Sequence, residues 1–192
     1  AALYLAAAGV GRLGIVDRET LEISNLHRQI LHLSADIGRA KSESARIRLN
    51  ALNPEVRIEA IQENLDELNT LRVMQAYDLV LDGSDNFPTH YLVNDACILL
   101  GKPLVHAGAI EMRGQLMSIM PRASACVRCV FPEPPSFGAI PSCQEGGVLG
   151  SAVGVIGSLM AHEALKILLG WGELLTNRLL IFDGKSSRFR EV

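Results

Sequence analysis

A repeated alternation of short apolar strands with helices is the feature that most constrains the fold of this chain. Four runs have the pattern of strands, at residues 12–17, 56–61, 79–82 and 104–107. Segments with helical spacing lie between them, at residues 41–52, 65–76 and 88–100. Strands separated by helices of this length predict βαβ crossovers and a mainly parallel, Rossmann-like sheet. We therefore expect an α/β fold whose ligands lie beyond the carboxyl ends of the strands.

The alternation changes in the C-terminal half of the chain. Residues 114–120 predict a strand that follows directly on the strand before it, so antiparallel strands are expected in the sheet from there onward. Residues 1–9 predict a helix that ends at Gly9. Residues 124–147 are expected to form a loop, and residues 145–169 contain one long helix. Residues 178–183 and 187–191 are expected to be the two strands of a closing hairpin.

Length and composition place the chain among soluble globular proteins. Its 192 residues suffice for one domain with a sizeable core, so residues 1–192 are expected to form a single domain. Charged residues make up 20% and the net charge is -3, which argues against disorder and against nucleic-acid binding. The most apolar run, residues 146–172, is interrupted by His162, Glu163 and Lys166, which favours a buried helix over a membrane span.

Cellular location is inferred from the N-terminus and the cysteines. No basic region of the kind that begins a signal peptide precedes the first apolar residues. The spacing of the four cysteines does not suggest a disulfide framework, and a reducing compartment fits better. A cytoplasmic protein is therefore expected.

The polar segment between Asp17 and Lys41 predicts a nucleotide phosphate site. Asp17 ends an apolar strand, where a dinucleotide-binding unit holds the ribose hydroxyls. Arg28 offers a planar fork for two phosphate oxygens, and Lys41 offers a compact point charge. Around them lies an unusually polar cluster, Ser24, Asn25, Leu26, His27, Arg28 and Gln29. The alternative is the solvated rim of an ordinary α/β domain. In a ribose-binding unit the Gly-rich turn lies about 20 residues before the acid, so that turn and the first strand are expected before residue 1.

The cysteines allow several interpretations. Cys126 and Cys129 form a C-x-x-C pair that suits half of a zinc site, a redox dithiol or neither. Cys97 lies in an apolar helical run and is expected to be a small core residue. Cys143 lies in a segment rich in proline and glycine, where it is either a loop residue or a thiol that reaches a reacting group.

The order of these motifs resembles the ThiF/MoeB/HesA family of adenylyltransferases, which are related to ubiquitin-activating enzymes. The resemblance covers essentially all of the chain and is particularly clear for MoeB-type proteins around residues 131–135 and 143–148. The motifs that carry it are Asp17, the segment 24–29, Lys41, Asp82-x-x-Asp85-Asn86, Cys126-x-x-Cys129 and the segment 154–158. Family members use ATP and Mg²⁺ to adenylate the C-terminal Gly-Gly carboxylate of a ubiquitin-fold sulfur carrier of the MoaD or ThiS type.

Roles for individual residues follow from the resemblance alone. It implies that Asp17 holds the ribose, that Asn25, Arg28 and Lys41 hold the phosphates, and that Asp85 holds Mg²⁺. The nucleotide-binding set would be Asp17, Ser24, Asn25, Leu26, His27, Arg28, Lys41, Asp85 and Asn86, with Arg28, Lys41 and Asp85 acting in catalysis. Cys126 and Cys129 would supply half of a four-cysteine Zn²⁺ site, with the second pair beyond Val192. Cys143 corresponds in position to the covalent sulfur-transfer cysteine of ThiF-type proteins.

Two other functions compete with adenylation. A nicotinamide-dependent oxidoreductase would also place an acid at Asp17, but it leaves Arg28, Lys41 and Asp85 unexplained. A non-catalytic module that dimerises or binds a carrier is the second alternative. A homodimer is expected both for an adenylyltransferase and for a non-catalytic module of the same family. The stretches 108–117 and 148–159 are apolar, rich in small residues and too extensive for one sheet to cover.

Overall fold

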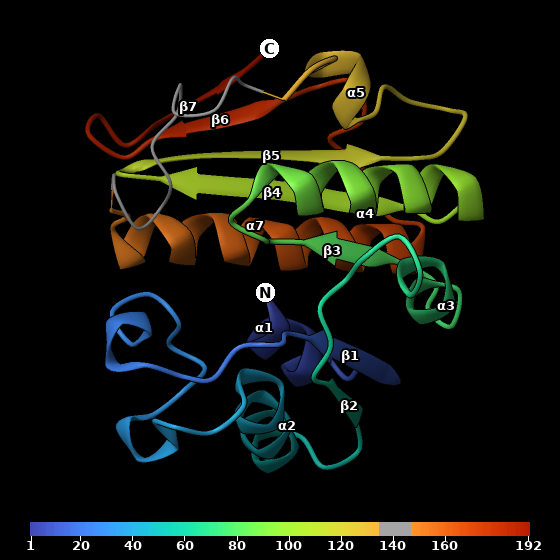
Figure 1. Ribbon diagram of the computed structural model, residues 1–192. Coiled ribbons are helices and arrows are strands. Elements are labelled where there is room, and N and C mark those ends of the chain that lie inside the picture. Colours follow the sequence, from blue (N-terminus) through green and yellow to red (C-terminus); the bar gives the residue numbers. More distant parts are fainter. Residues whose placement is uncertain (135–146) are drawn as a thin grey trace. The chain divides into compact units, whose positions relative to one another are not determined.

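The computed structural model (Figure 1) describes residues 1–134 and 147–192, which form two compact units. The first unit is Ala1–Leu65 and the second is Asp66–Val192. Each unit is described by itself below. The expectation of a single domain stays a prediction.

The first unit is a parallel strand pair covered by two helices. Its regular elements are α1 (Ala2–Ala7), β1 (Arg12–Val16), α2 (Lys41–Leu52) and β2 (Arg57–Ile61). Strand β1 runs parallel to β2, with Val16 opposite Ile61. Ala6, Leu49 and Ile58 are buried in its core. Gly9 has a φ of 79°, a left-handed conformation that glycine adopts without strain and that ends α1 before β1, as expected.

The second unit is a mixed five-stranded sheet with helices. Its strands lie in the order β3 (Val80–Asp82), β4 (Leu104–Ile110), β5 (Arg113–Ile119), β6 (Leu180–Asp183) and β7 (Arg188–Glu191). Its helices are α3 (Thr70–Met74), α4 (Phe87–Leu100), α5 (Val127–Val130) and α7 (Gly150–Leu169). Strands β3 and β4 are parallel, whereas β4 with β5, β5 with β6 and β6 with β7 are antiparallel. The expected addition of antiparallel strands and the closing hairpin are confirmed.

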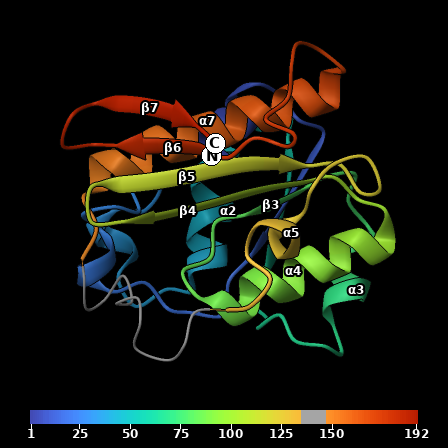
Figure 2. The same ribbon diagram turned by 90° about the horizontal axis from the view of Figure 1, so that it is seen from above.

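Helix α7 is the core helix of the second unit. Its length and composition would also suit a membrane-spanning helix, but it packs against β4 and β5. Figure 2 shows it and α4 on opposite sides of that strand pair. The contact is close at Gly114 of β5, where an added Cβ would lie 2.2 Å from Cγ1 of Ile156 in α7. The absence of a side chain at Gly114 therefore sets how near α7 approaches the sheet.

A buried carboxylate fixes α7 to its surroundings. Glu163 is only 3% exposed, and its Oε2 accepts hydrogen bonds from Ser118 Oγ at 2.7 Å and from Leu175 N at 2.9 Å. Its other oxygen pairs with Lys166 of the same helix. Burial alone would raise the pKa of Glu163, but the bonds from Lys166, Leu175 and Ser118 outweigh it and lower the pKa.

Two predicted helices begin later than the sequence pattern indicated. Helix α3 begins at Thr70 rather than at residue 65, because Oδ1 of Asp66 accepts hydrogen bonds from Leu68 N and Asn69 N and so stabilises a turn. Helix α7 begins at Gly150, since Gly147 adopts a left-handed conformation and Val148 forms a bridge with Glu111. In the loop expected at residues 124–147, the described part contains α5.

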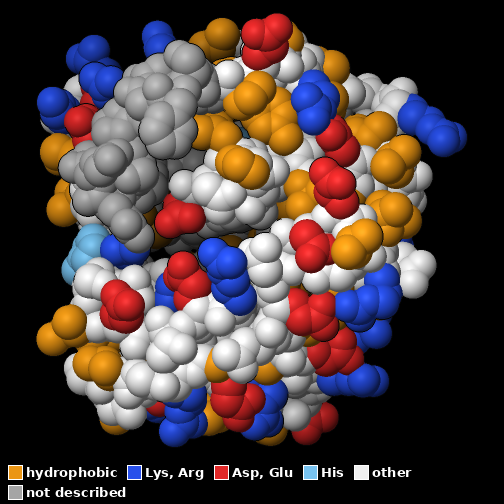
Figure 3. Space-filling view, in the orientation of Figure 1, with side chains coloured by type: hydrophobic (Ala, Val, Ile, Leu, Met, Phe, Trp, Pro, Cys, Tyr) orange, Lys and Arg blue, Asp and Glu red, His pale blue; other side chains and the backbone are white. Residues whose placement is uncertain are grey.

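Charged side chains of both signs are distributed over the surface. On the face shown in Figure 3, acidic and basic side chains are interspersed, with hydrophobic ones scattered between them. This distribution agrees with the small net charge of -3. The face shown in Figure 3 does not point to a polyanionic partner.

The close contact of α7 with β5 can be tested by substitution. Gly114→Ala should lower the free energy of unfolding by about 1–3 kcal/mol, because Ile156 must move to admit the methyl group. In an Ile156→Ala background the same change should cost much less. Gly108→Ala is the matched control, since its Cβ would meet nothing nearer than 3.9 Å. Urea denaturation measures all four variants, and equal costs at Gly114 and Gly108 would contradict the close contact.

The Glu163 network predicts a pH-dependent contribution to stability. A carboxylate with a lowered pKa stabilises the fold fully above its unfolded pKa, near 4.5, and loses that contribution as the pH falls through the folded pKa. Glu163→Gln should therefore cost about 1–3 kcal/mol at pH 7 and progressively less below pH 4.5. Denaturation across this pH range measures the difference. Glu173→Gln, at a side chain that is 92% exposed, should change little at any pH.

Candidate nucleotide-binding site

The carboxyl end of β1 carries the predicted ribose acid. Asp17 follows Val16, and its Oδ1 accepts a hydrogen bond from Glu19 N at 2.8 Å. The side chain is half-buried, and this burial raises its pKa despite the opposing effects of the Glu19 N–H and the charge of Lys41. The influence of Lys41 on Asp17 means that these two predicted residues share one electrostatic environment.

Short backbone pairing brings Lys41 to this strand end. Lys41 N donates to Glu19 O at 2.9 Å, and Leu21 N donates to Arg39 O at 2.8 Å. The Lys41 side chain is 6% exposed and forms an ion pair with Glu19, whose own side chain is 58% exposed. That bond with Lys41 lowers the pKa of Glu19. Glu19 was not among the predicted site residues, and nothing in its local sequence distinguishes it from a surface acid.

Two buried polar atoms near the predicted cations lack a partner. Among the described residues, the buried side-chain atoms without a hydrogen bond are Gln29 Oε1 and Ser42 Oγ. Each directly follows a predicted phosphate ligand in the sequence, Arg28 or Lys41. In the described part of the chain no side chain caps the N-terminus of α2, where backbone N–H groups and the helix dipole favour an anion. The residues at the start of α2 therefore suit a phosphate group.

The polar segment 24–29 folds around a short 3₁₀ turn, Ile23–Asn25. Asn25 is buried, and its Oδ1 accepts from Glu22 N at 3.0 Å. Arg28 Nη1 donates to Ser24 O at 3.1 Å and lies 2.8 Å from His27 Nε2. The main chain of Leu26 closes the same turn, through a hydrogen bond from its N–H to the carbonyl oxygen of Ile23. The fold thus holds five of the predicted residues, Ser24 to Arg28, close together.

The predicted magnesium ligand lies at the carboxyl end of β3 in the second unit. Asp85 is exposed, which suits an ion that keeps several of its water ligands. Asn86 is the N-cap of α4, and its Oδ1 accepts from Thr89 N at 2.9 Å. Asp85 and Asn86 belong to a different unit from Asp17 and Lys41, so a site shared by all four residues stays a prediction.

The C-x-x-C thiols lie close together at the start of α5. Cys126 Sγ and Cys129 Sγ are 3.6 Å apart, and two thiolates bound to one tetrahedral zinc ion would lie about 3.8 Å apart. The spacing therefore fits a half zinc site. Burial raises the pKa of Cys126, but hydrogen bonds from Cys129 outweigh it and lower the pKa. Cys143 lies outside the described residues.

Comparisons with known proteins identify the family of the chain. The model of the ThiF family matches residues 1–192. The chain belongs to the ThiF family. A sulfur carrier protein adenylyltransferase of Thermus thermophilus is 50% identical, over 98% of this chain and 72% of that protein. The adenylyltransferase and sulfurtransferase MOCS3 of Drosophila sechellia is also 50% identical, and this ThiF-family chain spans 42% of its length.

This ThiF-family chain has the same fold as a protein whose crystal structure is known. A crystal structure of Escherichia coli MccB with ATP superimposes with a TM-score of 0.86. The sequences are 20% identical, and the match covers 99% of this chain and 59% of MccB. This likeness confirms the predicted Rossmann-like α/β fold.

The environments of the cysteines predict different reactivities. In the folded protein, Cys126 should be alkylated with an apparent pKa below the ordinary 9.0. Cys97 should remain unmodified, because burial and the charge of Asp82 raise its pKa to about 12. Iodoacetamide labelling across pH, with peptide mapping by mass spectrometry, measures both. Labelling in urea is the control in which Cys97 should react, and a Cys126 that titrates at or above 9.0 would contradict this prediction.

Proposed function

We propose that this protein adenylates the C-terminal Gly-Gly carboxylate of a ubiquitin-like sulfur carrier with ATP, releases pyrophosphate and so prepares the carrier for thiocarboxylate formation. Family membership and 50% identity with a sulfur carrier protein adenylyltransferase support the proposal. The structural observation that carries it is the ammonium group of Lys41, which is held almost fully buried at the carboxyl end of β1. An ordinary surface loop has no need to bury a lysine.

The chemistry requires cations more than it requires a protein nucleophile. A carboxylate that attacks the α-phosphate meets like charge, and the departing pyrophosphate gains charge. Lys41 and Arg28 would stabilise that charge, and Asp17 would orient the ribose. Asp85 would hold Mg²⁺, which supplies a further positive charge beside the phosphate oxygens when it is bound.

The remaining assignments extend this proposal. Cys126 and Cys129 would contribute two ligands to a structural Zn²⁺ ion, as their separation allows. The protein would act as a homodimer that binds a carrier of the MoaD or ThiS type. Cys143 would be a covalent relay only if the carrier became attached to it during sulfur transfer.

Exchange of labelled pyrophosphate into ATP tests the adenylation step. The full-length protein should catalyse exchange only when a carrier that ends in Gly-Gly is present. Lys41→Ala and Arg28→Ala should each slow exchange by about 100-fold or more, because they remove charge that acts in the transition state. Asp85→Ala should in addition abolish the dependence on Mg²⁺.

The matched control is Arg46→Ala on the same helix as Lys41. Arg46 forms a half-exposed pair with Glu43, so its loss should leave exchange unchanged. Arg28→Ala and Arg46→Ala should melt within a few degrees of the parent protein, and Lys41→Ala, which removes the buried partner of Glu19, should be assayed below its own melting temperature. Variants at Lys41 and Arg28 that keep full activity would refute the assigned site. Exchange without a carrier would refute the substrate class, and hydride transfer with NAD(H) in its place would favour an oxidoreductase.

A further inference from the structure

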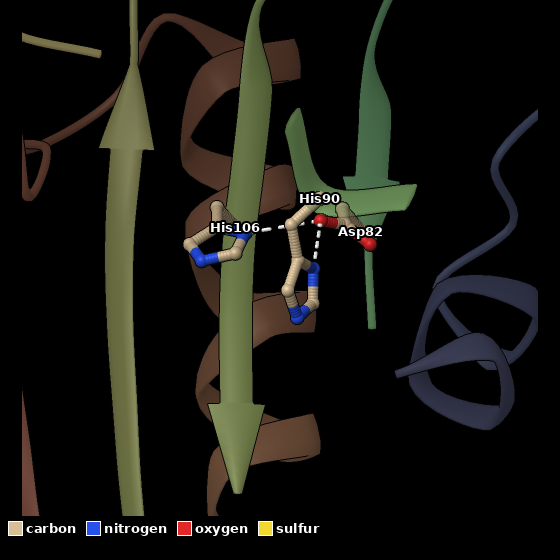
Figure 4. Close-up of side chains that lie close together, drawn as sticks. All are labelled: Asp82, His90 and His106. Carbon is tan, nitrogen blue, oxygen red and sulfur yellow. Dashed lines mark hydrogen bonds and ion pairs between the residues drawn. The ribbon is translucent and has the colours of Figure 1, made fainter. Parts of the chain in front are cut away.

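A buried cluster of two histidines and one carboxylate lies in the second unit, apart from the residues assigned above. Asp82 ends β3, His90 belongs to α4 and His106 belongs to β4 (Figure 4). Asp82 Oδ2 lies 2.7 Å from His90 Nδ1 and 3.0 Å from His106 Nδ1. The three side chains are 2%, 12% and 3% exposed, in that order. Three separate elements thus direct nitrogen and oxygen atoms at one point.

The Asp82 carboxylate is oriented so that its Oδ2 faces the two histidines. Ser84 N and Ser84 Oγ donate to Oδ1 of Asp82, at 3.1 Å and 2.7 Å. Oδ2 is left to face the two imidazoles. Hydrogen bonds that fix the second oxygen of a ligating carboxylate are a regular feature of metal sites.

The charge of the cluster also needs explanation. Burial alone would raise the pKa of Asp82, but the bonds from His106 and His90 outweigh it and hold the pKa well below its usual range. In the described part of the chain, Asp82 forms hydrogen bonds and ion pairs with Ser84 and the two histidines, and no lysine or arginine is among these partners. A buried carboxylate needs a cation, which is either an imidazolium or a bound metal ion.

We propose that Asp82, His90 and His106 bind one divalent transition-metal ion, with Zn²⁺ as the best match. Two neutral imidazoles and a carboxylate suit zinc, whereas Mg²⁺ prefers oxygen ligands alone. Ligands at 2.0–2.2 Å from a tetrahedral ion lie about 3.4 Å apart, and the potential ligand atoms of the three residues all lie within 4.8 Å of one another. Small shifts of the imidazoles would admit the ion, and water would fill the fourth position.

Metal titration in a variant without the Cys126, Cys129 and Cys143 thiols tests this site without ATP or carrier, and Cys97, which the variant keeps, is fully buried. The variant Cys126→Ser/Cys129→Ser/Cys143→Ser, stripped with a chelator, should bind one equivalent of Zn²⁺ by calorimetry. Co²⁺ should give a visible tetrahedral spectrum without thiolate charge transfer. His90→Gln and His106→Gln should weaken binding by more than about 100-fold, beyond the loss expected for an outer-shell partner. His162→Gln, at an exposed histidine of α7, is the matched control and should bind like the parent.

Histidine NMR decides between a metal site and a hydrogen-bonded apo cluster. Zn²⁺ should remove the Nδ1 protons of His90 and His106 and leave His162 unchanged. If His106→Gln does not fold, the proposal is still tested by His90→Gln, because the His90 side chain is more exposed than that of His106. The NMR measurement tests it independently of both variants. Absence of binding in the triple-serine variant, or unchanged binding in folded His90→Gln, would overturn the proposal. Because neither ATP nor a carrier is present, this result is independent of the pyrophosphate exchange result.

Discussion

An ionised side chain can be buried only where the fold supplies its counter-charge, and this requirement determines the local structure at three places in the protein. Lys41 is paired with Glu19, Asp82 with two histidines, and Glu163 with Lys166 and two hydrogen-bond donors. In each case at least one partner comes from a different segment of the chain, although Lys166 lies in the same helix as Glu163. Removing one partner would leave a charge or donor unsatisfied, which costs more than the pair contributes. These networks therefore specify the contacts of their elements more strictly than apolar packing could.

Much of the backbone could be predicted because local signals and the fold agree. Helix α2 has the predicted bounds, since Asn53-Pro54 prevents its continuation, and α4 begins at Phe87 with Pro88 in its first turn. Gly101 and Gly9 end their helices in left-handed conformations. The error at the start of α3 came where a side chain competed with the helix, as Asp66 does. Such competition depends on hydrogen bonds that residue spacing alone does not reveal.

In the candidate sites, too, some residues could be predicted from the sequence and others depend on tertiary contacts. Asp17, Arg28 and Lys41 could be predicted as a candidate site because their residue types and spacing fit one chemistry. Glu19 could not, because its pairing with Lys41 depends on backbone hydrogen bonds between residues 19–21 and 38–41. His106 faces Asp82 because β3 and β4 pair in that register, and His90 reaches the same carboxylate from α4. Strand register arises from tertiary packing, so the pairing of His106 with Asp82 could not be predicted from the sequence.

The end of β3 illustrates how one short segment separates two acids that have the same chemistry. Asp82 is the last residue of the strand, is 4% exposed and has its Oδ1 bound by Ser84. Asp85, three residues later, is exposed. Asn86 caps α4 through Thr89 N and so fixes the far end of the segment. Because Ser84 and Asn86 restrain the backbone on both sides of Asp85, that carboxylate can stay open to solvent without being disordered. Such a residue loses less conformational entropy when it takes up a cation than a residue on an unrestrained loop does.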